Sequence, residues 1–171
     1  MSQENKQSPT AIEPLEYENV RDDILALLME FEGCRLTAYK CSAGVNTIGW
    51  GHTAGVKEGD SISQEEADRM LAEDARAYYE DMLRLVAVPL TGGMAAALTS
   101  FCYNLGASYC KTCSLFKELN KGNYAVAAGK FGDYVYAGGM KLAGLVKRRA
   151  KEKEIFERDG FPCSNATGLG G

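Results

Sequence analysis

The segment EGCRLTAYKCSAGVNTIGWGHT, residues 32–53, joins the end of a helix to a small β-hairpin. After Gly33, the stretch LTAYK alternates apolar and polar side chains, residues 41–44 favour a turn, and residues 45–50 are rich in β-branched side chains and glycine. Before it, apolar residues recur at every third or fourth position, which predicts an amphipathic helix over residues 17–32. These apolar residues are Val20, Ile24, Leu27, Leu28 and Phe31. We therefore expect Glu32 on the last turn of a helix that leads into a hairpin.

Three chemically distinct side chains occur in this segment at a defined spacing: Glu32, eight residues, Cys41, five residues, Thr47. A carboxylate at a helix end, a thiol in a turn and a hydroxyl on the returning strand can converge across a helix-to-hairpin unit. A single glutamate at a helix end is usually just solvated, so Glu32 alone would predict no site.

A longer helix is predicted to follow the hairpin. Ser63 and Glu66 form the S-x-x-E pattern of a capping box, and the helical apolar face continues until just before Pro89. Four shorter helical stretches are expected between residues 92 and 160, with breaks at 105–106, 121–122 and 138–139. The predicted fold class is therefore α+β and mainly helical, with a small hairpin lobe and a helical lobe joined by the long helix. A cleft between the lobes is the natural ligand site.

The chain divides into one domain and two tails. We expect the domain to cover residues 15–160, with the small lobe at about 33–62 and the helical lobe at about 75–160 together with the N-terminal helix. The polar residues 1–14 and the stretch 161–171 are expected to be a disordered and a flexible tail.

Composition and charge argue against several classes of protein. The 171 residues are 46% hydrophobic and 25% charged, which is typical of one globular domain. A net charge of −4 argues against a general nucleic-acid binder. No apolar run reaches the roughly 18–20 residues of a membrane span, and the first twenty residues lack a secretory signal. We expect synthesis in the cytoplasm, reduced cysteines and no membrane insertion.

Charge is unevenly distributed along the chain. The stretch 141–158 carries seven cations against three anions and is expected to form a solvated face that attracts anions.

The segment 32–53 resembles the signature of the phage lysozymes, the muramidases of glycoside hydrolase family 24. That signature is Glu, eight residues, Asp or Cys, five residues and Thr, followed by a T-I-G-x-G-H strand. Three further blocks are similar in the same order: SFCYNLG at 100–106, LNKGNYAVAAGKF at 119–131 and GLVKRRAKEKEIF at 144–156. The resemblance covers about residues 18–160. It implies a lysozyme-like fold and an endolysin that hydrolyses the β-1,4 bond between N-acetylmuramic acid and N-acetylglucosamine in peptidoglycan.

The resemblance also implies roles for the three side chains. Cleavage of a glycosidic bond needs a proton for the leaving oxygen, and Glu32 fits that donor. Cys41 occupies the position that holds Asp in many relatives. In one interpretation the reaction inverts, and Cys41 and Thr47 position or activate a water. In another, Cys41 attacks the sugar and forms a thio-glycosyl intermediate; a third treats Cys41 as a turn residue without chemistry. We favour the inverting reaction.

Four further residues have expected roles in or beside the site. Asn104 matches an amide that lines the cleft in the family and can bind a sugar N-acetyl group, although it can equally cap a helix end. Arg148 is our candidate for a substrate-site cation near Glu32, with Arg149 as its close competitor. His52 is expected to be a hydrogen-bonded structural group beside the hairpin. No metal and no organic cofactor are implied.

Two other functions fit the sequence. The first is a catalytically inactive peptidoglycan-binding protein that has lost Asp at position 41. The second is a lytic transglycosylase, which also uses one glutamate and releases 1,6-anhydro ends. For the leading hypothesis we expect a monomer whose partner is the glycan strand, released by a phage holin from the host cytoplasm to act on the wall in the periplasm.

Overall fold

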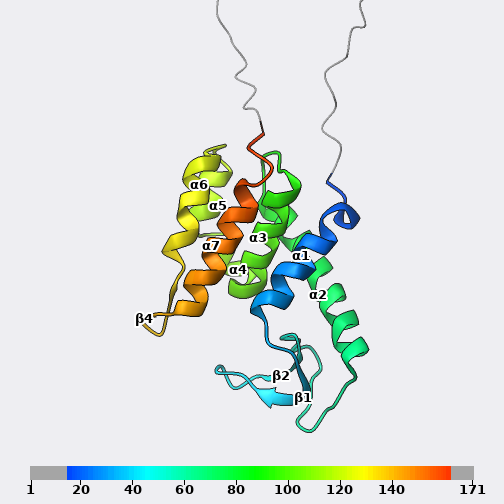
Figure 1. The fold of residues 1–171 in the computed structure, drawn as a ribbon. Coiled ribbons are helices and arrows are strands. Elements are labelled where there is room, and N and C mark those ends of the chain that lie inside the picture. Colours follow the sequence, from blue (N-terminus) through cyan, green and yellow to red (C-terminus); the bar gives the residue numbers. More distant parts are fainter. Residues whose placement is uncertain (1–14, 163–171) are drawn as a thin grey trace, which may run out of the picture.

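The structure, a computed structural model, describes residues 15–162 of the chain (Figure 1). The tail expected at 1–14, and residues 163–171 of the tail expected at 161–171, lie outside the described residues. The elements are α1 (Tyr17–Phe31), β1 (Arg35–Lys40), β2 (Asn46–Gly49), α2 (Gln64–Leu85), α3 (Gly92–Leu105), α4 (Ala107–Cys110), α5 (Ser114–Leu119), α6 (Tyr124–Lys130), the 3₁₀ turn η1 (Phe131–Asp133), β3 (Tyr136–Ala137), β4 (Met140–Lys141) and α7 (Ala143–Glu157).

Helix α3 forms the centre of the helical lobe. Its sequence GGMAAALTSFC consists largely of small side chains, and residues 93–102 are all buried. Helices α1, α2 and α7 pack against it. Small side chains let these helices approach closely: a Cβ added at Gly93 would lie 2.3 Å from the carbonyl oxygen of Ile155 in α7. The core is completed by aromatic residues such as Phe101, which meets Phe131 edge-on at 5.4 Å between ring centres.

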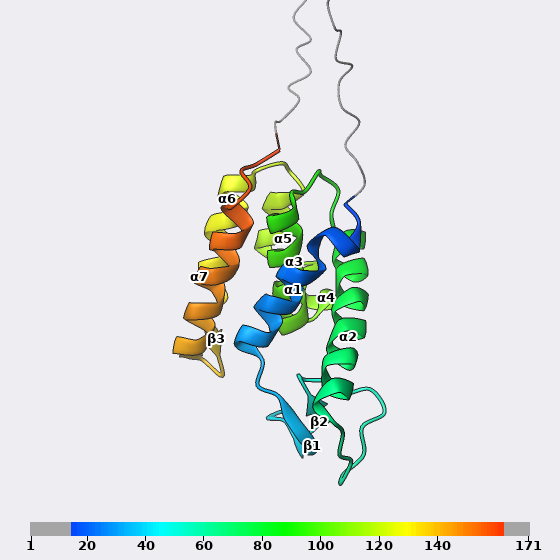
Figure 2. The same cartoon turned by 45° about the vertical axis from the view of Figure 1, so that its right-hand side comes forward.

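Helix α2 joins the two lobes, as the sequence predicts. The Ser63 hydroxyl accepts a hydrogen bond from the Glu66 backbone N–H at 3.1 Å and so caps the first turn. From that end, beside the hairpin, α2 runs up along the helices (Figures 1 and 2). The α+β, mainly helical fold with a small hairpin lobe is confirmed.

Strands β1 and β2 form the small antiparallel hairpin. Tyr39 pairs with Thr47 and Lys40 with Asn46, and the register is irregular between Arg35 and Tyr39. The turn is closed by the Cys41 N–H, which donates to the Val45 carbonyl at 3.0 Å. The register therefore brings Cys41 and Thr47 to the same end of the hairpin.

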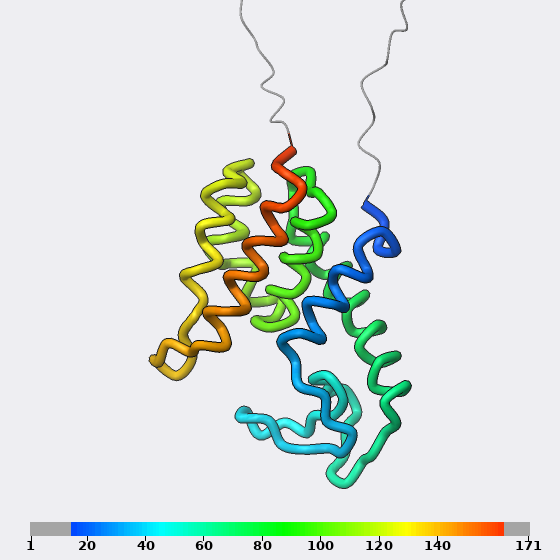
Figure 3. The backbone as a smooth tube through the Cα atoms, viewed as in Figure 1, coloured from blue at the N-terminus to red at the C-terminus, as the bar shows by residue number. Residues whose placement is uncertain are grey.

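A second hairpin, β3–β4, was not expected. The dipeptide Gly138-Gly139 was interpreted as a break between helices, whereas both glycines have positive φ (57° and 77°) and form the turn between two short strands. Two-residue strands are too short to show the alternation that predicts a strand. The two hairpins lie on the same side of the molecule, one in each lobe (Figures 1 and 3).

The packed region extends beyond the boundary expected at residue 160. The Phe161 ring stacks on Tyr124 at 5.8 Å and contacts Phe156. Phe161, the first residue after that boundary, is therefore in contact with α6 and α7.

Candidate active site

Glu32 lies where the chain passes from the helical lobe to the hairpin. It was expected on the last turn of the first helix, but it is the residue just after α1, with extended backbone angles (φ −94°, ψ 130°). Its N–H still donates to the Leu28 carbonyl at 2.8 Å, so α1 fixes its position. Gly33 then turns the chain toward β1.

The Glu32 carboxylate is bound by Arg148 of α7. The Arg148 Nη1 donates to Glu32 Oε1 at 2.5 Å. The same guanidinium donates from Nε to Glu152 Oε1 at 3.1 Å, and from Nη2 to the Ser100 carbonyl at 3.1 Å and hydroxyl at 3.2 Å. The Arg148 side chain is 4% exposed, whereas that of Glu32 is 23% exposed. Arg148 is thus a fixed internal cation that holds one oxygen of a partly accessible carboxylate.

Glu152 is the counter-ion behind this pair. Its side chain is 0% exposed and accepts a hydrogen bond from the Ser100 hydroxyl at 2.7 Å. Its second oxygen lies 2.9 Å from Nη1 of Arg149, which is also buried. Arg149 in turn donates from Nη2 to the side-chain oxygen of Asn104. Two arginines, two glutamates and their neutral neighbours therefore form one connected network from α1 through α7 to α3.

Glu152 and Ser100 belong to the site although the sequence alone does not predict them there. The stretch 141–158 is not a solvated basic face throughout, because two of its cations, Arg148 and Arg149, are buried and paired with Glu152. The spacing of Glu152 three and four residues after the arginines was an available signal, because residues at those steps share a helix face.

Cys41 and Thr47 form a second group at the hairpin turn. Hydrogen bonds from the backbone at Val45 and Ala43, together with the Thr47 side chain, lower the pKa of the Cys41 thiol. Thr47 is 3% exposed, and its hydroxyl donates to the Val45 carbonyl at 3.0 Å. A thiol with a lowered pKa carries a larger thiolate fraction near neutral pH, which is the form that accepts protons or acts as a nucleophile.

In the structure, the site residues predicted from the sequence therefore lie in three pairs of contacting side chains. Glu32 contacts Arg148, Cys41 contacts Thr47, and Asn104 contacts Arg149. Within residues 15–162, no hydrogen bond links Glu32 directly to Cys41 or Thr47. Asn104 does not end α3, because Gly106 is the capping residue. Within residues 15–162 its amide nitrogen donates no hydrogen bond.

His52 is held on both sides, as expected for a structural histidine. Its Nδ1 lies 2.7 Å from Asp74 Oδ2 and its Nε2 lies 3.0 Å from the Ala54 carbonyl. These residues line a polar cavity of about 250 Å³ together with Tyr103, whose hydroxyl donates to the Trp50 carbonyl at 3.0 Å. Burial raises the pKa of Tyr103, and the charges of Asp74 and Glu32 act in the same direction.

Neither a metal cluster nor a membrane helix is found in the described part of the chain. Residues 15–162 contain no group of three or more histidine, cysteine, aspartate or glutamate side chains placed to bind a metal ion. None of the helices in this range is both long and apolar enough to cross a bilayer.

Comparison with known proteins identifies the family. The sequence profile of the phage lysozymes matches residues 29–152. The chain belongs to the phage lysozyme family. This phage lysozyme is accordingly a glycoside hydrolase of the muramidase type that acts on peptidoglycan as an endolysin.

Relatives and solved structures agree with this assignment. An endolysin of Acyrthosiphon pisum secondary endosymbiont phage 1 is 39% identical over 137 residues, or 78% of this chain and 94% of that protein. The muramidase domain of SpmX from Asticaccaulis excentricus is 33% identical, with a TM-score of 0.73 over 78% of this chain and 94% of that one. A lysozyme of phage P22 has a TM-score of 0.69 with the same identity and coverage.

Proposed function

We propose that this phage lysozyme cleaves the β-1,4 bond between N-acetylmuramic acid and N-acetylglucosamine with inversion of configuration. Glu32 is the general acid, and Cys41 and Thr47 position and deprotonate the attacking water. The observation that carries this proposal is the placement of the two groups: a carboxylate held by Arg148 beside the helical lobe, and a thiol–hydroxyl pair on the hairpin, with no hydrogen bond between them in residues 15–162. An inverting glycosidase keeps its acid and its base apart, because a water stands between the sugar and the base.

Proton donation is assigned to the free oxygen of Glu32. Oε1 is engaged by Arg148, and the described residues place no hydrogen bond on Oε2. Oε2 therefore delivers the proton to the glycosidic oxygen as the bond to the muramyl anomeric carbon breaks. The negative charge that develops on Glu32 is met by the preorganised Arg148 guanidinium, whose own charge is balanced by Glu152.

The water is assigned to Cys41 and Thr47. Because the Thr47 hydroxyl donates to the Val45 carbonyl, its lone pairs remain to accept a hydrogen bond from water. The water oxygen bonds to the anomeric carbon on the face opposite the leaving group, and its proton passes to the Cys41 thiolate. The lowered pKa of Cys41 supports this assignment.

Substrate binding is assigned to Asn104 and Arg148. The Asn104 side-chain oxygen accepts from Arg149, so its NH₂ group faces the opposite way and donates to a sugar N-acetyl carbonyl. Arg148 contributes through Glu32, which it holds in place.

Product analysis on defined muropeptides tests the proposal. NMR should show the α-anomer as the first product, since inversion converts a β-bond into an α-hemiacetal; a β-anomer would instead support the thio-glycosyl intermediate. Mass spectrometry should show reducing ends, and 1,6-anhydro ends would establish a lytic transglycosylase. Glu32→Gln should abolish turnover while glycan binding persists. Binding without turnover in the unmutated protein would establish the inactive, peptidoglycan-binding alternative.

Delivery and assembly form a further part of the proposal. The enzyme acts as a monomer, is made in the host cytoplasm and reaches the wall in the periplasm through a holin. Expression in a Gram-negative host with and without a co-expressed holin tests the delivery step, and sedimentation of the purified chain tests the monomer. Prompt lysis without the holin would contradict the first, and a dimer at micromolar concentration would contradict the second.

A further inference from the structure

The hairpin lobe, residues 33–62, is fastened first of all to the helix that joins the lobes. The chain connects it to α1 at one end and to α2 at the other (Figure 1). The Trp50 indole N–H donates to Asp68 of α2 at 2.7 Å, and His52 Nδ1 lies 2.7 Å from Asp74, also of α2. These bonds hold the hairpin lobe to the first half of α2, but they do not by themselves tie it to α3 or α7.

Tyr103 of α3 supplies that tie. Its hydroxyl donates to the Trp50 carbonyl at 3.0 Å. Within residues 15–162, this is the one hydrogen bond between the hairpin lobe and the helices that follow α2. The hydroxyl also packs against the neighbouring backbone, since a Cβ added at Gly51 would lie 3.6 Å from it. The bond therefore links α3 directly to the hairpin lobe.

The Tyr103 hydroxyl is a firmly placed donor. Its ring packs against that of Tyr78 in α2, with ring centres 4.9 Å apart. Burial raises the pKa of Tyr103, so the hydroxyl keeps its proton at neutral pH and well above it. Tyr103 therefore donates the same hydrogen bond throughout the pH range in which hydrolysis is measured.

The Trp50 carbonyl is connected to the residues assigned to the attacking water. Ile48 and His52 exchange two backbone hydrogen bonds of 2.9 Å, which close the turn that contains Trp50. Ile48 belongs to β2 and directly follows Thr47, whose side chain contacts Cys41. A bond that holds Trp50 thus also holds the Cys41–Thr47 pair.

The other end of the tie lies beside the group that holds Glu32. Ser100 precedes Tyr103 by three positions in α3, so the two residues lie on neighbouring parts of the helix surface. The Ser100 carbonyl accepts from Arg148 at 3.1 Å, and Arg148 binds Glu32. The acid and the water pair are therefore connected through a short piece of α3.

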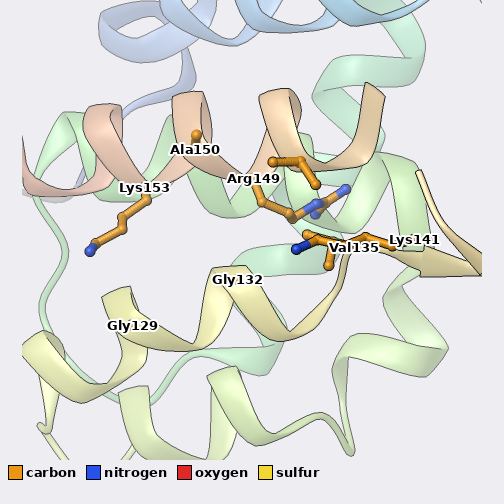
Figure 4. A pocket seen from close by; sticks show the side chains of 8 residues that line it. Gly129, Gly132, Val135, Lys141, Arg149, Ala150 and Lys153 are labelled. Carbon is orange, nitrogen blue, oxygen red and sulfur yellow. The ribbon is translucent and has the colours of Figure 1, made fainter. Parts of the chain in front are cut away.

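A second arginine of α7 fixes the same piece of α3. The Arg149 side chain extends from α7 to a place beside Val135 (Figure 4) and donates to Asn104, the residue after Tyr103. Arg149 is 1% exposed. Bonds from α7 thus reach α3 at Ser100 and at Asn104, on both sides of Tyr103, which gives the tyrosine a fixed base.

We propose that Tyr103 is a positioning residue, which keeps the hairpin turn with its Cys41–Thr47 pair in register with Glu32 by tying the turn after β2 to α3. This proposal rests on the proposed function, because it takes the acid and the water pair to act on one sugar. Such alignment is needed in the transition state, and a misplacement of about 1 Å can lower a rate by about 100-fold.

Residual dipolar couplings, measured by NMR on the full chain, test the tie apart from catalysis. Tyr103→Phe removes the donor and keeps the ring that packs on Tyr78. We expect the couplings of residues 33–62 to fall relative to those of α3 and α7, because the hairpin lobe then samples several orientations. An unchanged ratio of couplings would overturn the proposal.

Tyr78→Phe is the matched control. It removes a hydroxyl from the neighbouring ring, and that hydroxyl makes no hydrogen bond within residues 15–162. The ratio of couplings should therefore stay that of the unmutated protein. An equal change in the two variants would contradict a specific role of the Tyr103 hydroxyl.

Hydrolysis kinetics test the positioning itself. In Tyr103→Phe, kcat should fall by about threefold to tenfold, the range for the loss of one neutral hydrogen bond. KM should change by less than about twofold, because Asn104 and Glu32 keep their arginine partners and the loss is confined to the transition state. Rates are expressed per folded enzyme, counted by NMR, so that partial unfolding does not imitate the effect. An unchanged kcat, or an equal fall in Tyr78→Phe, would refute the positioning role.

A double-mutant cycle separates positioning from a general structural effect. If Tyr103 acts by aligning the Cys41–Thr47 pair, its loss should matter less in the Cys41→Ser background, where the proposed base is absent. Equal fold losses of kcat in the two backgrounds would count against the proposal, because they would indicate a disturbance unrelated to the pair.

The two kinds of measurement distinguish failure of this inference from failure of the proposed function. If the unmutated enzyme fails to hydrolyse glycan while Tyr103→Phe still changes the ratio of couplings, the proposed hydrolysis is wrong and the tie between the lobes stands. If hydrolysis proceeds and Tyr103→Phe changes neither the couplings nor kcat, the positioning role is wrong and the proposed function stands.

Discussion

Arg148 Nη1 lies 2.5 Å from Glu32 Oε1, and this contact ties the last helix of the fold to the residue that follows the first. The same guanidinium reaches Glu152 and Ser100, so the position of Glu32 depends on groups of α7 and α3 as well as on α1, which it follows. The proton donor of the proposed reaction is thus positioned by the core of the helical lobe.

Arg148→Gln should therefore damage both stability and catalysis. It removes a buried cation and leaves Glu152 to Arg149 alone, so we expect a loss of about 3–5 kcal/mol in the free energy of unfolding, measured in urea. Turnover should fall as well, because Glu32 loses its anchor. Arg69→Gln is the matched control. Arg69 pairs with Glu73 at 2.9 Å but is exposed, so the free energy of unfolding should change by no more than about 0.5 kcal/mol. Equal losses in the two variants would contradict the internal role of Arg148.

The pH dependence of hydrolysis should report Cys41. If its thiolate accepts the proton of water, kcat/KM rises with pH as the thiol ionises. The lowered pKa of Cys41 places this rise below that of an ordinary thiol. Cys41→Asp should move the rise toward about pH 4, near the ordinary value for aspartate, and Cys41→Ser should remove it. An unchanged profile in Cys41→Ser would show that the residue only positions water.

The cysteines should differ sharply in reactivity toward iodoacetamide. Cys110 and Cys113 are buried, and their contacts with neighbouring thiols together with burial raise their pKa values. Cys41 has a lowered pKa and is partly exposed, so it should be alkylated well before either of them at pH 8. Mass spectrometry of tryptic peptides measures the order. Labelling of Cys110 ahead of Cys41 in the folded protein would contradict the arrangement.

Gly93→Ala tests the closeness of α3 and α7. The new Cβ would meet the Ile155 carbonyl oxygen at 2.3 Å and a side-chain oxygen of Asp159 at 3.0 Å, so the helices must separate. We expect a loss of about 1–3 kcal/mol, although alanine favours helices. Gly144→Ala, where the Cβ meets nothing within 4 Å, should cause no loss and a gain of up to about 1 kcal/mol. Thermal unfolding of both variants measures these changes in stability. A Gly93→Ala protein as stable as the unmutated one would refute the close contact between α3 and α7.

Local features of the fold were predictable, because the residues that specify them are near one another in the chain. Ser63 caps the helix that begins at Gln64, and the alternation after Gly33 becomes β1. The β3–β4 hairpin escaped prediction because its strands are two residues long and only their antiparallel pairing reveals them.

The candidate site was predictable only in part. The spacing of Glu32, Cys41 and Thr47 and the family resemblance pointed to residues of which Glu32 contacts Arg148, and Cys41 contacts Thr47, in the structure. The burial of Arg149 and Glu152 was not foreseen, because a charged residue on a basic stretch is usually solvated. Ser100, which contacts Glu152 across 52 positions of the chain, carries no local signal at all.

The proposed acid and the proposed water-binding pair lie on different lobes, and this placement has a mechanical consequence. Glu32 is bound to α7 of the helical lobe, whereas Cys41 and Thr47 lie at the turn of the hairpin. A hinge-like rotation between these bodies would change the gap across which acid and water must act on one sugar carbon. A glycan bound to both lobes would fix the distance between Glu32 and the Cys41–Thr47 pair. The bound substrate would thus complete the active site that cleaves it.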